Sequence, residues 1–364
     1  MIPGPSEPEP EVLAELSLPI LPHYGEAWMS AYKETTQMLQ RVFGTKNEVI
    51  IVPIPGALAV EMAAVNLVAK GEEAFVCVNG LFSNSIVEAI NAIGGKAVAI
   101  RSELGTGPTL EQVKSALDGA KDLTGKSIFV VQNETSTGAA VNPGEIFSYC
   151  KKKGMFTVLD AISAIGGMEL KTDDWKVDFS IGYSSKALGG VNGADPLAIS
   201  KEVWDHALRR KGKIRSTFLD LNAWREAIDV DSSWGHPHPT SMPTSLIMAL
   251  RKAVSMALEE GLEKRYRRHA LAAKELRNGL EALGLEIFTD PKYYSNTVSV
   301  AKVEAAWDLE LRDRLVKDYN IMIAGGLGPL KGQVIRVGHM GRSARHANIE
   351  LTLSALGSVL KQVR

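Results

Sequence analysis

Two stretches near the middle of the chain, FTVLD at 156–160 and FSIGYSSKALGGVNGA at 179–194, carry the clearest structural signal. Each begins with a short run of apolar and β-branched residues, which is typical of a buried strand. The first run ends in Asp160, and the second leads through two serines to Lys186 and a glycine-rich segment. The sequence therefore predicts two strands that carry an aspartate and a lysine at their ends.

The same alternation continues outward on both sides of these stretches. Short apolar runs are separated by longer amphipathic segments, and this order argues for parallel βαβ units with helices on both faces of a sheet. The predicted strands are 49–52, 74–78, 97–100, 127–131, 156–160, 179–181 and 197–199, and the predicted helices are 25–43, 58–70, 83–93, 110–117 and 143–153.

The pattern changes in residues 232–243, where WGHPHPTSMP packs three prolines and two histidines into a stretch that cannot form a helix interior. One long helix is predicted after it, from residue 244 to about residue 283. The rest of the chain mixes both element types. Strands are predicted at 297–303, 321–324 and 334–338, and helices at 308–318 and from about 347.

The length of 364 residues corresponds to about two domains at roughly 150 residues each. The mixed character of the C-terminal third predicts that it forms the smaller of the two. We therefore expect an N-terminal arm at 1–20, a large domain at 21–245 and a small α+β domain at 246–364.

Composition excludes several classes of protein. Lysine and arginine number 41 against 42 acidic residues, and this net charge of −1 argues against a nucleic-acid binder. No apolar run approaches the roughly 18 residues of a membrane span, and the acidic, proline-rich N-terminus does not read as a signal peptide. The two cysteines, Cys77 and Cys150, argue against a disulfide framework and against a Cys-based zinc site. We expect a cytoplasmic protein with no membrane, nucleic-acid or metal partner.

Lys186 and Asp160 are the candidate catalytic pair. A lysine at a strand end beside small residues can be desolvated enough for its amine to become nucleophilic, and an aspartate on a neighbouring strand end could hold a protonated ring nitrogen. Those are the two protein groups that pyridoxal phosphate (PLP) requires. The alternative is that Lys186 is solvated and Asp160 only caps a loop.

Two further segments follow predicted strands and could bind a ligand. In PIPGALAVE at 53–61, the backbone N–H groups of a helix start suit a phosphate, although an ordinary βα turn reads the same way. The missing GxGxxG and GxxxxGK[ST] patterns argue against a nicotinamide or nucleotide enzyme. The polar loop NETSTG at 133–138 lies where open α/β sheets bind their ligands.

Arg336 stands out in the predicted strand VIRVG. The alternation of a strand places Ile335 and Val337 on one face and Arg336 on the other, alone among apolar neighbours. Such an arginine is either paired with a carboxylate of the protein or available to a carboxylate of the substrate. The sequence leaves both alternatives open.

Taken together, these motifs resemble a known family. The run from IPGP at 2–5 through NETSTG, LDAISAIGG, SSKALGG and IAGGLGPLKG to IRVGHMG is similar to the class V aminotransferases, and within them to the alanine–glyoxylate and serine–pyruvate group. The resemblance implies a fold-type-I PLP transferase, α/β, with a mostly parallel central sheet in a large domain and a smaller α+β C-terminal domain. It implies transfer of an amino group from a small amino acid to a 2-oxo acid such as glyoxylate or pyruvate.

The resemblance also implies roles for individual residues. Lys186 occupies the place of the Schiff-base lysine, and Asp160 that of the partner of the pyridine nitrogen. Thr135 stands where a hydroxyl bonds the cofactor ring oxygen, and Phe82 where an aromatic side chain stacks on the ring. Arg336 matches the arginine that grips the substrate carboxylate.

Two other matches concern the edges of the site. Gly4 lies where the N-terminal arm approaches the substrate. Thr240 corresponds to a residue that reaches the cofactor phosphate from the neighbouring subunit, which implies a homodimer with shared active sites. His23 could line the pocket or lie at the entry of a helix.

The chain departs from the family around the phosphate. PIPGALAVE carries no hydroxyl, with Ala57 where the family often has Thr, Ser or His, and Ser185 replaces a common Gln. The usual APPG after the lysine becomes GGVNGAD. The phosphate would then depend on backbone amides at Gly56, Ala57 and Leu58, together with Ser185 and Thr240.

Two rival functions remain. A PLP lyase or desulfurase on the same fold would need a mobile nucleophilic cysteine, whereas Cys77 and Cys150 lie in apolar elements. A non-catalytic accessory protein that kept the fold would explain the altered phosphate loop.

Overall fold

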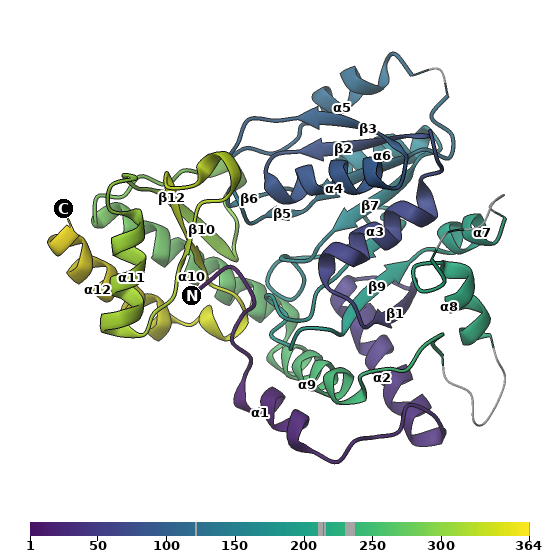
Figure 1. Cartoon of the computed structure of the whole chain (residues 1–364), viewed down its shortest axis with the longest axis horizontal. Helices are drawn as coiled ribbons and strands as arrows, with labels where there is room; N and C mark the ends of the chain where they lie inside the picture. Colours follow the sequence, from purple (N-terminus) through teal and green to yellow (C-terminus); the bar gives the residue numbers. More distant parts are fainter. Residues whose placement is uncertain (121, 210–213, 215, 230–236, 364) are drawn as a thin grey trace.

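A computed structural model of the chain describes residues 1–120, 122–209, 214, 216–229 and 237–363. It contains two main sheets, and the N-terminus lies beside the smaller one (Figure 1). Of the proline-rich stretch predicted at 232–243, residues 232–236 lie outside the described residues. Residues 237–243 form neither helix nor strand, as predicted.

The larger sheet has seven strands in the order β1-β9-β8-β7-β4-β2-β3. Neighbouring strands run parallel except at β9, which is antiparallel to both β1 and β8. The prediction of a mostly parallel α/β sheet is therefore confirmed. The strands are β1 Glu48–Val52, β2 Glu73–Val78, β3 Lys96–Arg101, β4 Ser127–Val131, β7 Phe156–Asp160, β8 Phe179–Ile181 and β9 Asp195–Ile199.

Helices cover both faces of this sheet because its strands are apolar on both sides. In β1, for example, Ile50 and Val52 face one core, and Val49 and Ile51 face the other. The first core is closed by α3 Gly56–Leu67, α4 Leu81–Ala92, α7 Lys201–Arg209 and α8 Leu221–Ile228. The second is closed by α2 Glu26–Phe43, α5 Leu110–Leu117, α6 Gly144–Lys152 and α9 Thr244–Glu260.

The carboxyl ends of the parallel strands meet at one edge of the sheet. The start of α4 follows β2 there, the polar loop 133–138 follows β4, and Asp160 ends β7. The segment that carries Lys186 follows β8. This edge is where open α/β sheets bind their ligands, so the topology collects the predicted site residues in one place.

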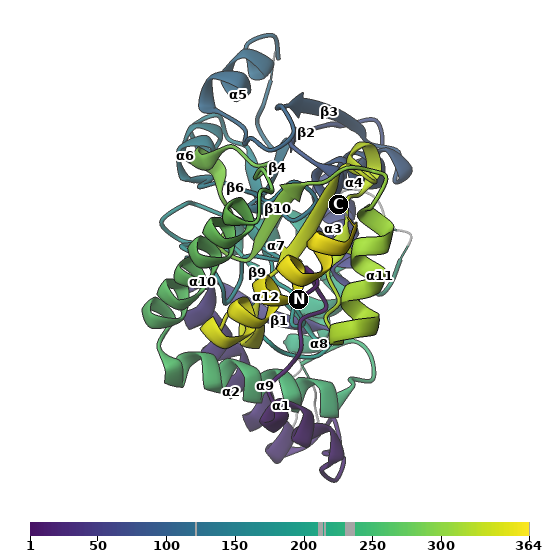
Figure 2. The ribbon, with the colours of Figure 1, turned by 90° about the vertical axis from the view of Figure 1, so that its left-hand side faces the viewer.

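The smaller sheet has the order β10-β12-β11 and is antiparallel. Three helices pack with it around a separate core (Figure 2). The strand predicted at 321–324 is wrong in extent, because only Ala324–Gly325 pairs with β12. The elements are β10 Val298–Lys302, β11 Ala324–Gly325, β12 Val334–Gly338, α10 Leu262–Ala282, α11 Asp308–Tyr319 and α12 His346–Val363.

The single helix predicted from 244 to about 283 is also wrong. Gly261 separates α9 from α10 and has φ +85° and ψ 126°, a conformation that no helical residue adopts. The break lets α9 pack on the larger sheet through Ile247 and Leu250, whereas α10 packs on the smaller one through Leu276. Helical periodicity continues across the glycine, so the sequence pattern alone did not reveal the break.

Several short elements complete the described chain. No helix in its described parts is long and apolar enough to cross a membrane. The remaining elements are α1 Pro10–Ala14, the hairpin strands β5 Asn133–Glu134 and β6 Ala139–Ala140, and the 3₁₀ turns η1 Glu15–Ser17, η2 Pro291–Tyr293, η3 Gly328–Leu330 and η4 Gly341–Ser343.

The backbone at Gly261 leads to a stability prediction. We expect Gly261→Ala to lower the free energy of unfolding by about 1–3 kcal/mol, because a residue with a Cβ is strained at this φ and ψ. Gly119→Ala is the matched control, since both glycines have open space for a Cβ and only Gly261 has a positive φ. Denaturant unfolding of both variants measures the difference. Equal stabilities would show that the break does not depend on glycine.

Candidate active site

A cavity of about 290 Å³ lies at the carboxyl edge of the larger sheet. It is lined by residues from segments that are far apart in the sequence, including the N-terminal arm and the loops after β1, β4 and β7. Among the predicted site residues, those that line it are Gly4, Gly56, Ala57, Phe82, Thr135, Asp160 and Lys186.

Lys186 is the cation of this cavity. Its Nζ donates a hydrogen bond to the Pro3 carbonyl at 2.5 Å. Burial and the nearby charge of Arg336 lower the pKa of Lys186 to about 8, because both disfavour the ammonium form. A Cβ on Gly4 would lie 2.3 Å from this Nζ, and Gly4 has φ +106°, so a glycine is needed where the arm meets the lysine. The amine is thus poised to act as a nucleophile near neutral pH.

Asp160 is the anion of the cavity and ends β7, which pairs in parallel with β8. Its Oδ1 accepts the backbone N–H of Ile162 at 2.9 Å. Burial, and to a smaller degree the charge of Glu134, raise the pKa of Asp160 to about 7. A cation placed against this carboxylate would stabilise its ionised form.

A second buried carboxylate, Glu134, organises the wall next to Asp160. It accepts the backbone N–H groups of Phe82 at 3.3 Å and Ser83 at 2.8 Å. A carboxylate at the N-terminus of a helix is favourable, so Glu134 holds the first turn of α4, from which Phe82 lines the cavity. Sequence reasoning missed Glu134. The signal for it was a charged residue inside NETSTG, directly before Thr135.

The segment predicted to bind a phosphate is the start of α3. Gly56 and Ala57 line the cavity, and Gly56 is the first residue of the helix. Leu58 does not line it, and its N–H donates to the Pro55 carbonyl at 2.8 Å. Ser185 is buried beside the cavity rather than in its wall.

Arg336 approaches from β12 of the smaller sheet and is buried, while Ile335 and Val337 lie in the apolar core as predicted. Its Nε donates to the Gly325 carbonyl at 2.8 Å, and its Nη1 donates to the Thr135 carbonyl at 3.2 Å. These partners are carbonyls rather than a carboxylate. Arg336 does not line the cavity, and the charge of the nearby Glu134 also acts on its guanidinium, so its binding of a substrate carboxylate stays a prediction.

Two other arginines near β12 have partners of their own. Arg342 pairs with Glu7 at 3.1 Å, and Arg345 pairs with Glu9. Both carboxylates belong to the N-terminal segment, so these arginines fasten that segment to the smaller sheet. Arg336 therefore remains the candidate for binding a substrate carboxylate.

Thr240 and His23 lie away from this cavity. The Thr240 carbonyl accepts the Nδ1–H of His238 at 2.7 Å, and His238 in turn accepts the indole N–H of Trp28 at 3.1 Å. The rings of His23 and His238 are 5.7 Å apart. Thr240 is thus not placed to serve the cavity of its own chain.

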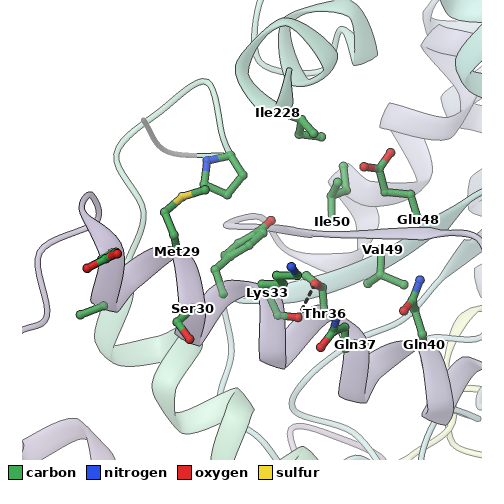
Figure 3. Close-up of a pocket in the computed structure, with 14 residues that line it drawn as sticks. Met29, Ser30, Lys33, Thr36, Gln37, Gln40, Glu48, Val49, Ile50 and Ile228 are labelled. Carbon is green, nitrogen blue, oxygen red and sulfur yellow. Dashed lines mark hydrogen bonds between the residues drawn. The ribbon is translucent and has the colours of Figure 1, made fainter. Parts of the chain in front are cut away.

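A larger hollow of about 1050 Å³ lies between α2, β1 and α8 (Figure 3). Side chains such as Met29, Lys33, Gln37 and Glu48 line it. None of the predicted site residues belongs to its lining within the described chain. The candidate active site is therefore the smaller cavity around Lys186.

The smaller cavity fits PLP by the chemistry of its donors. It combines an amine of lowered pKa, a buried carboxylate that a protonated ring nitrogen would stabilise, and helix-start N–H groups suited to a phosphate. The nucleophile of a desulfurase is missing from its walls, because Cys77 and Cys150 are buried in the core and neither lines it.

Comparisons with known proteins agree with this geometry. Residues 20–344 match the family model Aminotransferase class-V. An uncharacterized aminotransferase of Methanocaldococcus jannaschii is 33% identical, covering 100% of this chain and 94% of its own length. The structure of ureidoglycine–glyoxylate aminotransferase from Bacillus subtilis has a TM-score of 0.93 at 29% identity, covering 100% of this chain and 92% of that one.

A second solved structure is similar to this chain to the same degree. The alanine–glyoxylate aminotransferase from Nostoc sp. has a TM-score of 0.92 at 29% identity, covering 99% of this chain and 94% of that one. The fold and the family predicted from the motifs are both confirmed. The chain belongs to the class V aminotransferase family.

Proposed function

We propose that this protein is a PLP-dependent aminotransferase that moves an amino group between a small, alanine- or serine-like amino acid and a 2-oxo acid such as glyoxylate or pyruvate. One observation carries the proposal: Asp160 ends β7, Lys186 follows the neighbouring strand β8, and both line one cavity. The family and the names of its members support amino-group transfer. The cofactor and the choice of substrate rest on the residues of the site.

Each side chain of the site has a separate role in amino-group transfer. When bound, PLP supplies an aldehyde that reacts with amines and a ring that accepts an electron pair from the substrate Cα. Lys186, with a pKa of about 8, takes the proton from Cα as a base and returns it as an acid. With PLP bound, Asp160 would hold a proton on the ring nitrogen, and Phe82 would restrain the ring by stacking. The Thr135 hydroxyl would donate to the ring oxygen.

The selection of substrate follows from Arg336 and from the size of the cavity. A guanidinium binds a carboxylate through two parallel hydrogen bonds, which suits both amino acids and 2-oxo acids. The cavity has a volume of about 290 Å³, which favours a substrate with a small side chain once PLP is bound. The Gly4 segment borders this space.

We propose that the active form is a homodimer with Thr240 of one subunit serving the site of the other. Thr240 lies away from its own cavity, beside α2. Large apolar side chains before α2 are unusually exposed, with Leu18 at 55% and Ile20 at 78%. A contiguous exposed apolar segment is typical of a surface that another chain covers.

The organisation of the chain supports two further parts of the proposal. We propose an arm at 1–20, a large domain from 21 and a small domain that ends at 364. Because α9 packs on the larger sheet, we place the boundary at Gly261 rather than after residue 245. Two free, buried cysteines are consistent with the reducing cytoplasm.

The first experiment locates the cofactor. Borohydride reduction of the PLP-loaded protein followed by peptide mass mapping should find the cofactor on Lys186, and Lys186→Ala should remain folded without it. Since only the neutral amine reacts, the rate of PLP attachment should rise with pH through about 8. Lys201→Ala, which changes an exposed lysine of α7, is the control and should load normally. Cofactor on another lysine, or on none, would contradict the proposal.

The second experiment tests the carboxylate site. Losing one partner of a desolvated charge pair costs roughly 2–5 kcal/mol, so Arg336→Ala should lower kcat/KM by about 30- to 5,000-fold for amino and 2-oxo acids alike. Cofactor content should stay near normal, and amines without a carboxylate should be hardly affected. Arg345→Ala is the control, because Arg345 pairs with Glu9. A larger loss in the control would move the assignment to Arg345.

The third experiment tests the shared site. Thr240→Ala should weaken PLP retention on dialysis, because the phosphate loses a hydroxyl. Mixing inactive Lys186→Ala subunits with Thr240→Ala subunits should restore normal sites, since each mixed dimer then holds one site with both residues intact. Absence of recovery in verified mixed dimers would show that Thr240 does not cross the interface.

A further inference from the structure

The segment after Lys186 places an amide side chain at the cavity that has no counterpart in the usual APPG. Asn192, within GGVNGAD, lines the cavity together with Tyr183, which lies just before the lysine. Neither residue was singled out from the sequence. Asn192 belongs to GGVNGAD, where the chain departs from the family pattern, and that departure was the available signal.

Asn192 is held in one orientation by two hydroxyl groups. Its Oδ1 accepts a hydrogen bond from the Tyr183 hydroxyl at 3.1 Å and another from the Ser185 hydroxyl. Oδ1 is the acceptor end of the amide, so these two bonds leave both N–H donors of Nδ2 for other partners. Asn192 is exposed rather than packed in the core, and it lines the cavity.

Tyr183 fixes this arrangement next to the start of α3. A Cβ on Gly56 would lie 3.1 Å from Cδ2 of Tyr183 and 2.8 Å from Cδ1 of Ile162, so the tyrosine ring packs directly on the first residue of the helix. The N–H groups at a helix start have no carbonyl partner within the helix. Tyr183 therefore contacts both the start of α3 and Asn192, and it holds Asn192 near the end of the cavity that offers these backbone donors.

The charges of the cavity favour an anion at this end. The Asp160 carboxylate repels a phosphate, whereas the helix start and the Asn192 amide offer only N–H donors. Another carboxylate of the region, Asp195, is buried, and its Oδ1 accepts bonds from the N–H and hydroxyl of Ser184 at 3.0 and 3.1 Å. Asp195 does not line the cavity.

We propose that Asn192 binds the phosphate of PLP through its amide N–H groups, with Tyr183 and Ser185 as the positioning residues that aim it. It replaces the hydroxyl that PIPGALAVE lacks. This assignment rests on the proposed function, since it concerns the cofactor of that site. It predicts that affinity for the phosphate comes from the segment after Lys186 rather than from a side chain at the start of α3.

Binding of two probes to the dialysed full-length protein tests the assignment without measuring activity. PLP and pyridoxal share the ring and the aldehyde, and only PLP carries the phosphate. Dissociation constants from the visible absorption band should show that Asn192→Ala weakens the binding of PLP by about 10- to 100-fold and leaves the binding of pyridoxal unchanged. This is the range expected for the loss of a hydrogen bond to a charged group. Asn192→Asp should weaken PLP further through charge repulsion.

Tyr183→Phe separates positioning from direct contact. It should weaken the binding of PLP by a smaller factor than Asn192→Ala does. This effect should disappear in the Asn192→Ala background, because the tyrosine acts through the asparagine. Tyr149→Phe on α6, outside the cavity, is the matched control and should bind PLP like the parent.

The outcomes separate this assignment from the proposed function. Unchanged PLP affinity in Asn192→Ala, or equal losses for PLP and pyridoxal, overturns the role of Asn192 while the aminotransferase proposal stands. A parent protein that binds neither probe overturns both. A parent that binds PLP and pyridoxal equally well shows that no phosphate site exists, and this also overturns the assignment.

Discussion

The pairing of β7 with β8 is the constraint on which the site depends. The parallel register sets Asp160 opposite Ile181, so the carboxylate at the end of one strand lies beside the segment that carries Lys186. Neither residue could be desolvated in this way on an isolated loop. The helices on both faces of the sheet exclude water from the strands, and the strand ends bring the charged groups to the one edge that is still open.

The charged groups of the site have opposite signs. Asp160 and Lys186 line the cavity, whereas the buried Glu134 and Arg336 do not line it but contact two residues that do, Phe82 and Thr135. Burial raises the pKa of Asp160 to about 7 and lowers that of Lys186 to about 8. Near pH 7 the site can therefore change its protonation state at low cost. This property is needed by a residue that must accept a proton and return it.

Much of this arrangement could be predicted from the sequence because it depends on local patterns. The strands that end at Asp160 and before Lys186 are short apolar runs, and the alternation in VIRVG correctly put Arg336 on the face opposite Ile335. The break between α9 and α10 at Gly261 could not be predicted from the pattern of apolar residues. Periodicity does not register a single residue whose backbone leaves the helical region.

The residues that sequence reasoning missed share a different property, since their roles depend on contacts between distant segments. Glu134 matters because its carboxylate reaches the first turn of α4, and Asn192 because two hydroxyls on the other side of Lys186 orient it. No periodicity encodes such contacts. Departures from a family pattern marked the region of Asn192, but only the fold shows that its amide and the start of α3 line the same cavity.

The N-terminal arm shows how the two sheets come to share one site. The N–H of Gly338, at the end of β12, donates to the Met1 carbonyl, and the N–H of Ser6 donates to the Ser185 carbonyl beside Lys186. Between these two anchors the arm brings the Pro3 carbonyl to the lysine amine. The arm is thus held by the smaller sheet at one point and by the lysine segment at the next. The strand that carries Arg336 and the segment that carries Lys186 therefore both fix the arm whose Pro3 carbonyl contacts the lysine amine.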